Sequence, residues 1–233
     1  MKSLGKLLLG TALAGGLMVP AQAQDVVAVL SQNETGATSY NPVSATLLSV
    51  GAWLMYDRLV AKDENLQYVP NLAESWEEAP DGMTWTFKLK SGVKFHDGSA
   101  LTSKDVSYSL KRILDPSLGA TGLATLKPYL EAGGIDDSNP AVVKLSLIRP
   151  HAFLPAVISG AQYSVVKDGT TDFSKGNGTG PFALAVFDPA ARVTLQRADG
   201  YWQDGLPYLD EVQVVVITED ATRLQALLSG SQD

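Results

Sequence analysis

The chain has 233 residues, of which 45% are hydrophobic, a formal net charge of −7 and no cysteine. The lack of cysteine excludes disulfides, thiolate metal sites and a lipid anchor attached through a cysteine. The acidic balance argues against nucleic acids and anionic membranes as partners, and the apolar fraction is ordinary for a globular protein with a packed core.

The N-terminus has the layout of a secretory signal peptide. A basic start with Lys2 and Lys6 precedes residues 7–19, which are apolar or small and carry no charge. Small residues then lead to Ala23, so we expect residues 1–23 to be a signal peptide that is cleaved after Ala23. The alternative is a buried core helix. A membrane anchor does not fit, because it needs about 20 apolar residues and this run is shorter and interrupted by glycine. The pattern predicts export to the periplasm of a two-membrane bacterium.

The segment after the predicted cleavage point combines a strand with a polar loop. Residues 26–30 form a short apolar run that suits a buried strand. The next loop is rich in turn formers, and loops after buried strands often carry ligand contacts. Asn33, Glu34 and Tyr40 are therefore candidate ligand-binding residues, the alternative being a solvated surface loop. Apolar spacing over residues 46–60 predicts a helix packed on a sheet.

Apolar residues alternate with polar ones after a turn at Asp81-Gly82, which predicts a strand with one buried face. The apolar positions are Trp85, Phe87 and Leu89, and the pattern resumes at Val93 and Phe95. Thr102 and Asp105 then have the spacing of a capping box, and apolar residues follow at helical intervals. Asp115-Pro116 is expected to end this helix.

The remaining elements follow from the same periodicities. The predictions are a half-buried strand over 143–147, a short helix over 151–159, a strand over 163–166, a hairpin of 182–187 with 193–195, a strand within 206–217, and a helix that Asp220 caps and Gly230 ends, with Leu224, Leu227 and Leu228 on one face.

Two further sequence features are candidate ligand contacts. Glycines 176, 178 and 180 superficially resemble a phosphate-binding loop, but no Gly-Lys-Ser/Thr follows and Pro181 leads into a strand. We expect instead that the backbone passes close to a cleft at Gly178, Thr179 and Gly180, where side chains would obstruct it. Tyr201 and Trp202 could stack on a ligand or pack between domains.

Nothing in the sequence indicates catalysis. His96 and His151 are the only histidines, and no Gly-x-Ser-x-Gly, HxH or HExxH pattern occurs. His96 precedes a turn and is expected to bond to backbone. We therefore predict no catalytic residues, no metal site and no cofactor.

Several motifs together resemble one family. LAESWE, DG-x-TWTF-x-LK, SGVKFHDG, LTSKDV, GTGPF and LPYLDE occur in this order. The chain resembles the family 5 extracellular solute-binding proteins, which serve peptide and nickel ABC importers. The resemblance implies an α/β fold of the type II periplasmic-binding-protein kind, with residues 24–65 and 158–233 in the first domain and a small α+β domain, residues 66–157, inserted between them. Family members are about twice as long, so we expect this to be an N-terminal half without the opposing lobe.

The resemblance also implies a function. We expect a receptor that closes on a small solute, most simply a peptide, and delivers it to a membrane-embedded ABC permease, working as a monomer at full length. Nickel chelates, oligosaccharides and opine-like solutes remain alternatives. So does a truncated remnant or interaction protein that transports nothing, whereas a peptidase would need a catalytic group that neither histidine provides. The predicted ligand contacts are Asn33, Glu34, Tyr40, Gly178, Thr179, Gly180 and Trp202.

Overall fold

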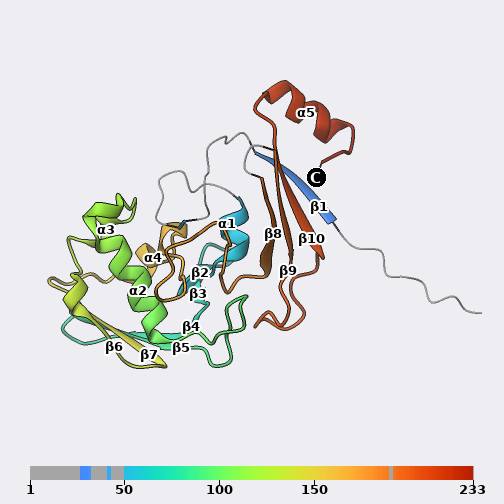
Figure 1. The fold of residues 1–233 in the computed structure, drawn as a ribbon. Helices are drawn as coiled ribbons and strands as arrows, with labels where there is room; N and C mark the ends of the chain where they lie inside the picture. Colours follow the sequence, from blue (N-terminus) through green and yellow to red (C-terminus); the bar gives the residue numbers. More distant parts are fainter. Residues whose placement is uncertain (1–26, 33–40, 43–49, 189–190, 233) are drawn as a thin grey trace, which may run out of the picture.

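The computed structural model describes residues 27–32, 41–42, 50–188 and 191–232. These residues form two four-stranded sheets and a two-stranded ribbon, joined by short helices. Figure 1 shows the two larger sheets at opposite sides of the molecule, with α1 and α4 between them. In this part of the chain, no helix is long and apolar enough to cross a membrane.

The first sheet has the strand order β1-β10-β9-β8. Its strands are β1 (Val27–Gln32), β8 (Phe182–Asp188), β9 (Arg192–Arg197) and β10 (Glu211–Val216). β1 pairs with β10 in parallel, so residues 27–32 lie beside residues 211–216, whereas the other pairs are antiparallel. The predicted hairpin and the predicted strands at both ends are confirmed. Helix α1 (Val50–Met55) packs against β8 over an apolar core that includes Met55 and Leu195.

The second sheet is antiparallel and has the order β4-β5-β7-β6. Its strands are β4 (Ala73–Glu78), β5 (Thr84–Leu89), β6 (Ile135–Asn139) and β7 (Val142–Ser146). The predicted alternation is confirmed, because Trp85, Phe87 and Leu89 are buried while the residues between them are more exposed. The turn that starts β5 is also confirmed, since Met83 donates its backbone N–H to the Asp81 carboxylate.

Helix α2 (Ser103–Leu114) covers the second sheet and begins as the sequence predicts. The Asp105 carboxylate accepts hydrogen bonds from the Thr102 backbone N–H at 2.7 Å and from the Thr102 hydroxyl at 2.8 Å. The remaining elements are β2 (Val60–Lys62), β3 (Tyr68–Pro70), η1 (Pro116–Leu118), α3 (Leu123–Leu126), η2 (Ala132–Gly134), α4 (Leu154–Ile158), η3 (Ala161–Tyr163) and α5 (Asp220–Leu228).

Two predicted strands are wrong. Val93 and Phe95 are buried, but they belong to a turn-rich segment, because Gly92 and Gly98 adopt φ of +78° and +82°. Residues 163–166 continue from η3 as irregular chain, with their backbone hydrogen bonds made to a neighbouring loop and to a serine of α2 instead of a strand.

Two predicted helices differ in detail. In the predicted helix over 46–60, the described residues are helical only from Val50 to Met55, and Val60 starts a strand. Helix α5 begins at Asp220, so Glu219 is its cap position and no side chain caps it. Leu224, Leu227 and Leu228 share this helix as predicted, yet all three are more than half exposed.

Candidate functional site

The glycine-rich loop between α4 and β8 lies directly on the backbone at the end of α1. The Gly180 N–H donates to the Met55 carbonyl at 2.9 Å. A Cβ atom on Gly180 would lie 2.5 Å from the Leu54 carbonyl oxygen, and one on Gly178 would overlap the Met55 carbonyl oxygen. Glycine is therefore required here because two backbone segments approach each other too closely for any side chain.

His96 holds the same loop from the other side. Its Nε2 lies 2.9 Å from the Gly180 carbonyl oxygen, and its Nδ1 accepts the Gly178 N–H at 3.2 Å and lies 3.3 Å from the Gly176 carbonyl oxygen. The bond from the Gly178 N–H favours the tautomer in which Nε2–H donates to Gly180. The His96 N–H also donates to the Gly178 carbonyl. The prediction that His96 bonds to backbone is confirmed, with the partner in a loop about 80 residues later in the chain.

Asp57, directly after α1, is the centre of a buried hydrogen-bond network. It is 7% exposed. Its Oδ2 accepts the Trp202 indole N–H at 2.9 Å and the Thr179 hydroxyl at 3.2 Å, while Oδ1 accepts the Asn71 side-chain amide at 3.3 Å. Burial raises the pKa of the Asp57 carboxyl, and these three donors oppose the rise. One carboxylate thus joins segments that are distant in the sequence.

The aromatic pair at residues 201–202 rests on this network. The Tyr201 and Trp202 rings lie 5.5 Å apart at an angle of 56°. The Lys90 ammonium lies 5.6 Å from the centre of the Trp202 ring, and Trp202 also packs against the core of the second sheet. Burial, with the nearby Asp57 charge, raises the pKa of the Tyr201 hydroxyl above its ordinary value. Tyr201 is therefore a neutral hydrogen-bonding group at physiological pH.

A hollow of about 550 Å³ opens beside these residues. Its size lies within the range of small-molecule sites. The polar residues and glycine-loop residues on its wall include Lys94, His96, Thr179, Gly180, Asp199 and Tyr201.

The network brings together four of the seven predicted ligand contacts. Gly178, Thr179 and Gly180 are buried in the glycine-rich loop, and Trp202 reaches the same carboxylate as Thr179. Asn33, Glu34 and Tyr40 lie outside the described residues. Sequence reasoning missed Asp57 and Arg58, and the available signal was a pair of charges inside the apolar run MYDRLV.

The histidine and the acidic residues in the described part of the chain limit the chemistry that the site can perform. Both ring nitrogens of His96 are occupied by backbone groups, so the ring is not placed as a general base. Within the described part of the chain, no three His, Cys, Asp or Glu residues are grouped so as to hold a metal ion.

Comparison with known proteins gives consistent matches. The family model described as bacterial extracellular solute-binding proteins, family 5 middle, matches residues 67–233. The glutathione-binding protein GsiB of Escherichia coli (strain K12) is 31% identical over 232 residues, covering 97% of this chain and 44% of that protein. The chain thus spans less than half the length of this curated relative.

Solved structures match the fold. The structure of AgaA from A. tumefaciens R10 in complex with agropinic acid has a TM-score of 0.80 and 29% identity, covering 89% of this chain and 43% of that one. A nickel ABC transporter structure from Bacillus halodurans has a TM-score of 0.74 and 28% identity, covering 90% and 42%. The predicted α/β fold of the periplasmic-binding-protein type is confirmed over about half the length of these structures.

Proposed function

Because this chain belongs to the bacterial extracellular solute-binding proteins of family 5, we propose that it forms one wall of a site that captures a small peptide-type solute for an ABC importer. The family consists of binding proteins and not of enzymes, in agreement with the sequence prediction. The observation that carries the proposal is the 550 Å³ hollow, where Tyr201 meets the glycine-rich loop.

Glutathione is the first solute to test. The E. coli relative, named for binding glutathione, is 31% identical over almost the whole of this chain. A peptide-type solute, with both amine and carboxylate groups, also suits the chemistry of the hollow, whose wall combines an exposed lysine, two aspartates, a neutral tyrosine and a glycine loop. Extended peptides are bound chiefly through main-chain hydrogen bonds, with pockets for alternate side chains.

Each proposed contact has a distinct role. Thr179 already donates its hydroxyl to Asp57, and the N–H groups of Gly178 and Gly180 are bonded to His96 and Met55. The loop therefore offers a solute a close packing surface and the second lone pair of the Gly180 carbonyl. The Trp202 indole N–H is likewise occupied, and its ring packs against the core of the second sheet with Lys90 nearby, so a solute contact would use the part of the ring that stays exposed. Tyr201 supplies a ring edge and a hydroxyl. We keep Asn33, Glu34 and Tyr40 as proposed contacts of the first loop.

The wider setting is proposed from the family. A signal peptide over residues 1–23 would deliver the chain to the periplasm, and closure of two lobes on the solute would be recognised by a membrane permease. The division into a first domain of 24–65 and 158–233 with a small domain of 66–157 belongs to the same proposal.

Calorimetric titration of the purified chain tests the proposal. The titrants are glutathione and a mixed pool of di- to pentapeptides, and the variants are Tyr201→Ala and Tyr208→Ala, the second being 82% exposed and outside the hollow. We expect saturable heat with the parent and with Tyr208→Ala, and affinity about three- to tenfold weaker for Tyr201→Ala because an aromatic contact is lost. No heat from any peptide would contradict a peptide-type solute.

Opine-type and nickel-chelate solutes form a second candidate. The observation in their favour is 29% identity to a protein solved with agropinic acid and 28% identity to a nickel ABC transporter protein. Titration with agropinic acid and with nickel–histidine beside the peptides would separate the two candidates.

A further inference from the structure

Arg58 carries a positive charge that the described residues do not neutralise. Its guanidinium lies 4.5 Å above the centre of the Trp53 ring. Its Nε and Nη1 atoms are covered from water and have no hydrogen-bond partner, and none of its nitrogens donates to a residue that the structure describes. Burying a charged donor without a partner is costly, so such a group is expected to have an anionic partner at some stage of the protein's work.

The neighbouring carboxylate does not fill this role. Asp57 uses both oxygens to accept from Trp202, Thr179 and Asn71, and no ion pair between Asp57 and Arg58 is found among the described residues. Burial lowers the pKa of the Arg58 guanidinium, while the Asp57 charge acts in the opposite direction. The guanidinium thus remains an under-compensated cation beside a committed carboxylate.

Arg58 faces a second hollow, of about 360 Å³. Its wall includes Trp53, Arg58, Lys62, Thr125, Ser159 and Gln162, and none of the described residues that line it is acidic. Two cations with hydroxyl and amide groups, and no negative charge, form a wall that favours an oxyanion. Arg58 is on the wall of this hollow and Tyr201 is on the wall of the larger one, and the two side chains are close enough for the charge of each to act on the other.

We propose that this second hollow is a carboxylate site, in which Arg58, supported by Lys62, binds an acidic group of the solute. The proposal rests on the proposed function and deepens it, because it assigns the solute class: anionic peptides or other organic acids. Trp53 covers the planar guanidinium from one face, and Nη2, the one nitrogen of the group that is not covered, is the atom through which a carboxylate in the hollow makes its first contact. Glutathione carries two carboxylates and one amine, and it therefore fits this class.

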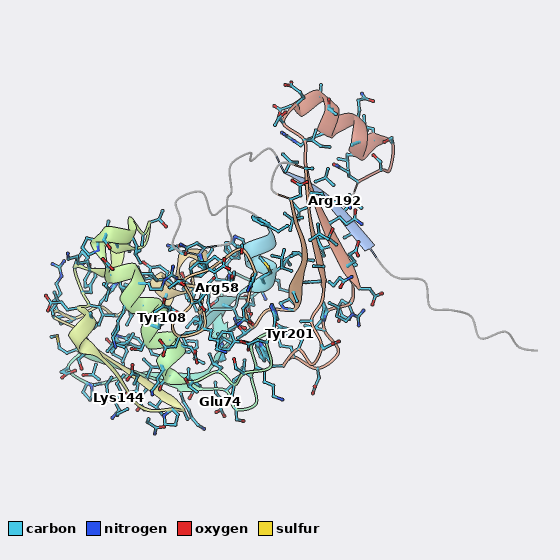
Figure 2. All side chains as sticks on the ribbon, viewed as in Figure 1. Arg58, Glu74, Tyr108, Lys144, Arg192 and Tyr201 are labelled. Carbon is cyan, nitrogen blue, oxygen red and sulfur yellow. The ribbon has the colours of Figure 1, made fainter. Side chains whose placement is uncertain are left out.

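The test compares a free acid with its ester. The probes are glutathione, glutathione diethyl ester with both carboxylates blocked, sodium acetate and inorganic phosphate. Binding is followed by calorimetry and by the arginine side-chain Nε–H NMR signals of the ¹⁵N-labelled chain, the Arg58 signal being assigned by its loss in Arg58→Gln. Arg58→Lys keeps the charge, and Arg192→Gln makes the same charge change at an exposed position far from the hollow (Figure 2).

We expect glutathione to shift the Arg58 signal saturably and to bind at least about tenfold more tightly than its ester. Arg58→Gln should lose this preference, Arg58→Lys should keep part of it, and Arg192→Gln should match the parent. Thermal melts establish that each variant is folded. If Arg58→Gln does not fold, the test rests on comparing the binding of glutathione and of its ester to the parent and to Arg58→Lys.

Equal binding of acid and ester by the parent, or a preference that survives Arg58→Gln, would overturn the carboxylate site. Saturation by phosphate as strong as by acetate would also overturn it, since it would indicate an unselective anion site. If no peptide binds the parent, the proposed function fails in its peptide form, and acetate decides the inference: a saturable shift of the Arg58 signal supports it, and no shift refutes it.

Discussion

Removal of the Asp57 carboxylate should destabilise the whole arrangement around the glycine-rich loop. In Asp57→Ala, the Trp202 indole, the Thr179 hydroxyl and the Asn71 amide lose their shared acceptor. Each lost hydrogen bond to a carboxylate costs about 1.5–3 kcal/mol of stability. Part of this loss is offset because the folded variant no longer has to bury a desolvated charge. We therefore expect a loss of about 3–5 kcal/mol in the free energy of unfolding.

Urea and thermal unfolding, followed by circular dichroism and tryptophan fluorescence, measure this loss. For a chain of this size it corresponds to a fall in Tm of about 6–20 °C. Asp57→Asn keeps one acceptor oxygen and should cost less, about 1–2 kcal/mol. Asp204→Ala, at an exposed position in the same region as Trp202, should stay within about 0.5 kcal/mol of the parent. If Asp57→Ala unfolds like Asp204→Ala, the network does not hold these segments together.

Three further changes test other parts of the account. Gly178→Ala should lower the free energy of unfolding by at least about 2 kcal/mol, because the added Cβ would overlap the Met55 backbone. Gly133→Ala should be tolerated, because a Cβ at Gly133 meets open space. Equal urea midpoints for the two variants would refute the close approach. Trp85→Ala should cost about 3–5 kcal/mol, and a melt like the parent's would contradict the buried strand face. Partial burial acts to raise the pKa of Asp97, but its lysine and serine partners outweigh it and hold the pKa well below 3.8. The contribution of Asp97 to the free energy of unfolding is therefore present above pH 4 and is lost as the pH falls below it. Asp97→Asn should flatten the curve of unfolding free energy against pH below pH 4.

Local sequence signals predicted the elements whose cause is local. Alternation around Trp85 and Phe87 reflects the period of a strand with one buried face, and the Thr102–Asp105 pair satisfies its own helix terminus. The strand predicted at 163–166 failed because an apolar run has the same composition whether its backbone bonds to a sheet or to scattered partners.

The candidate site was only partly predictable because its organising contacts are long-range. Asp57 and Trp202 are 145 residues apart in the sequence, and no periodicity links them. The glycine-rich loop was recognised from its motif. The reason for its glycines, close approach to the Met55 backbone, depends on which segment lies beneath it. Arg58 was missed in the sequence, where its one signal is a charge inside an apolar run, and its lack of a partner among the described residues is a property of the folded chain.

The most direct test of the central claim is a map of backbone and indole NMR shifts when the ¹⁵N-labelled chain is titrated with glutathione. We expect saturable shifts that cluster at residues 178–180, at Tyr201, at the Trp202 indole and around Arg58. Saturable binding whose shifts cluster on another surface, or no shifts at millimolar glutathione and at the same concentration of the peptide pool, would contradict it.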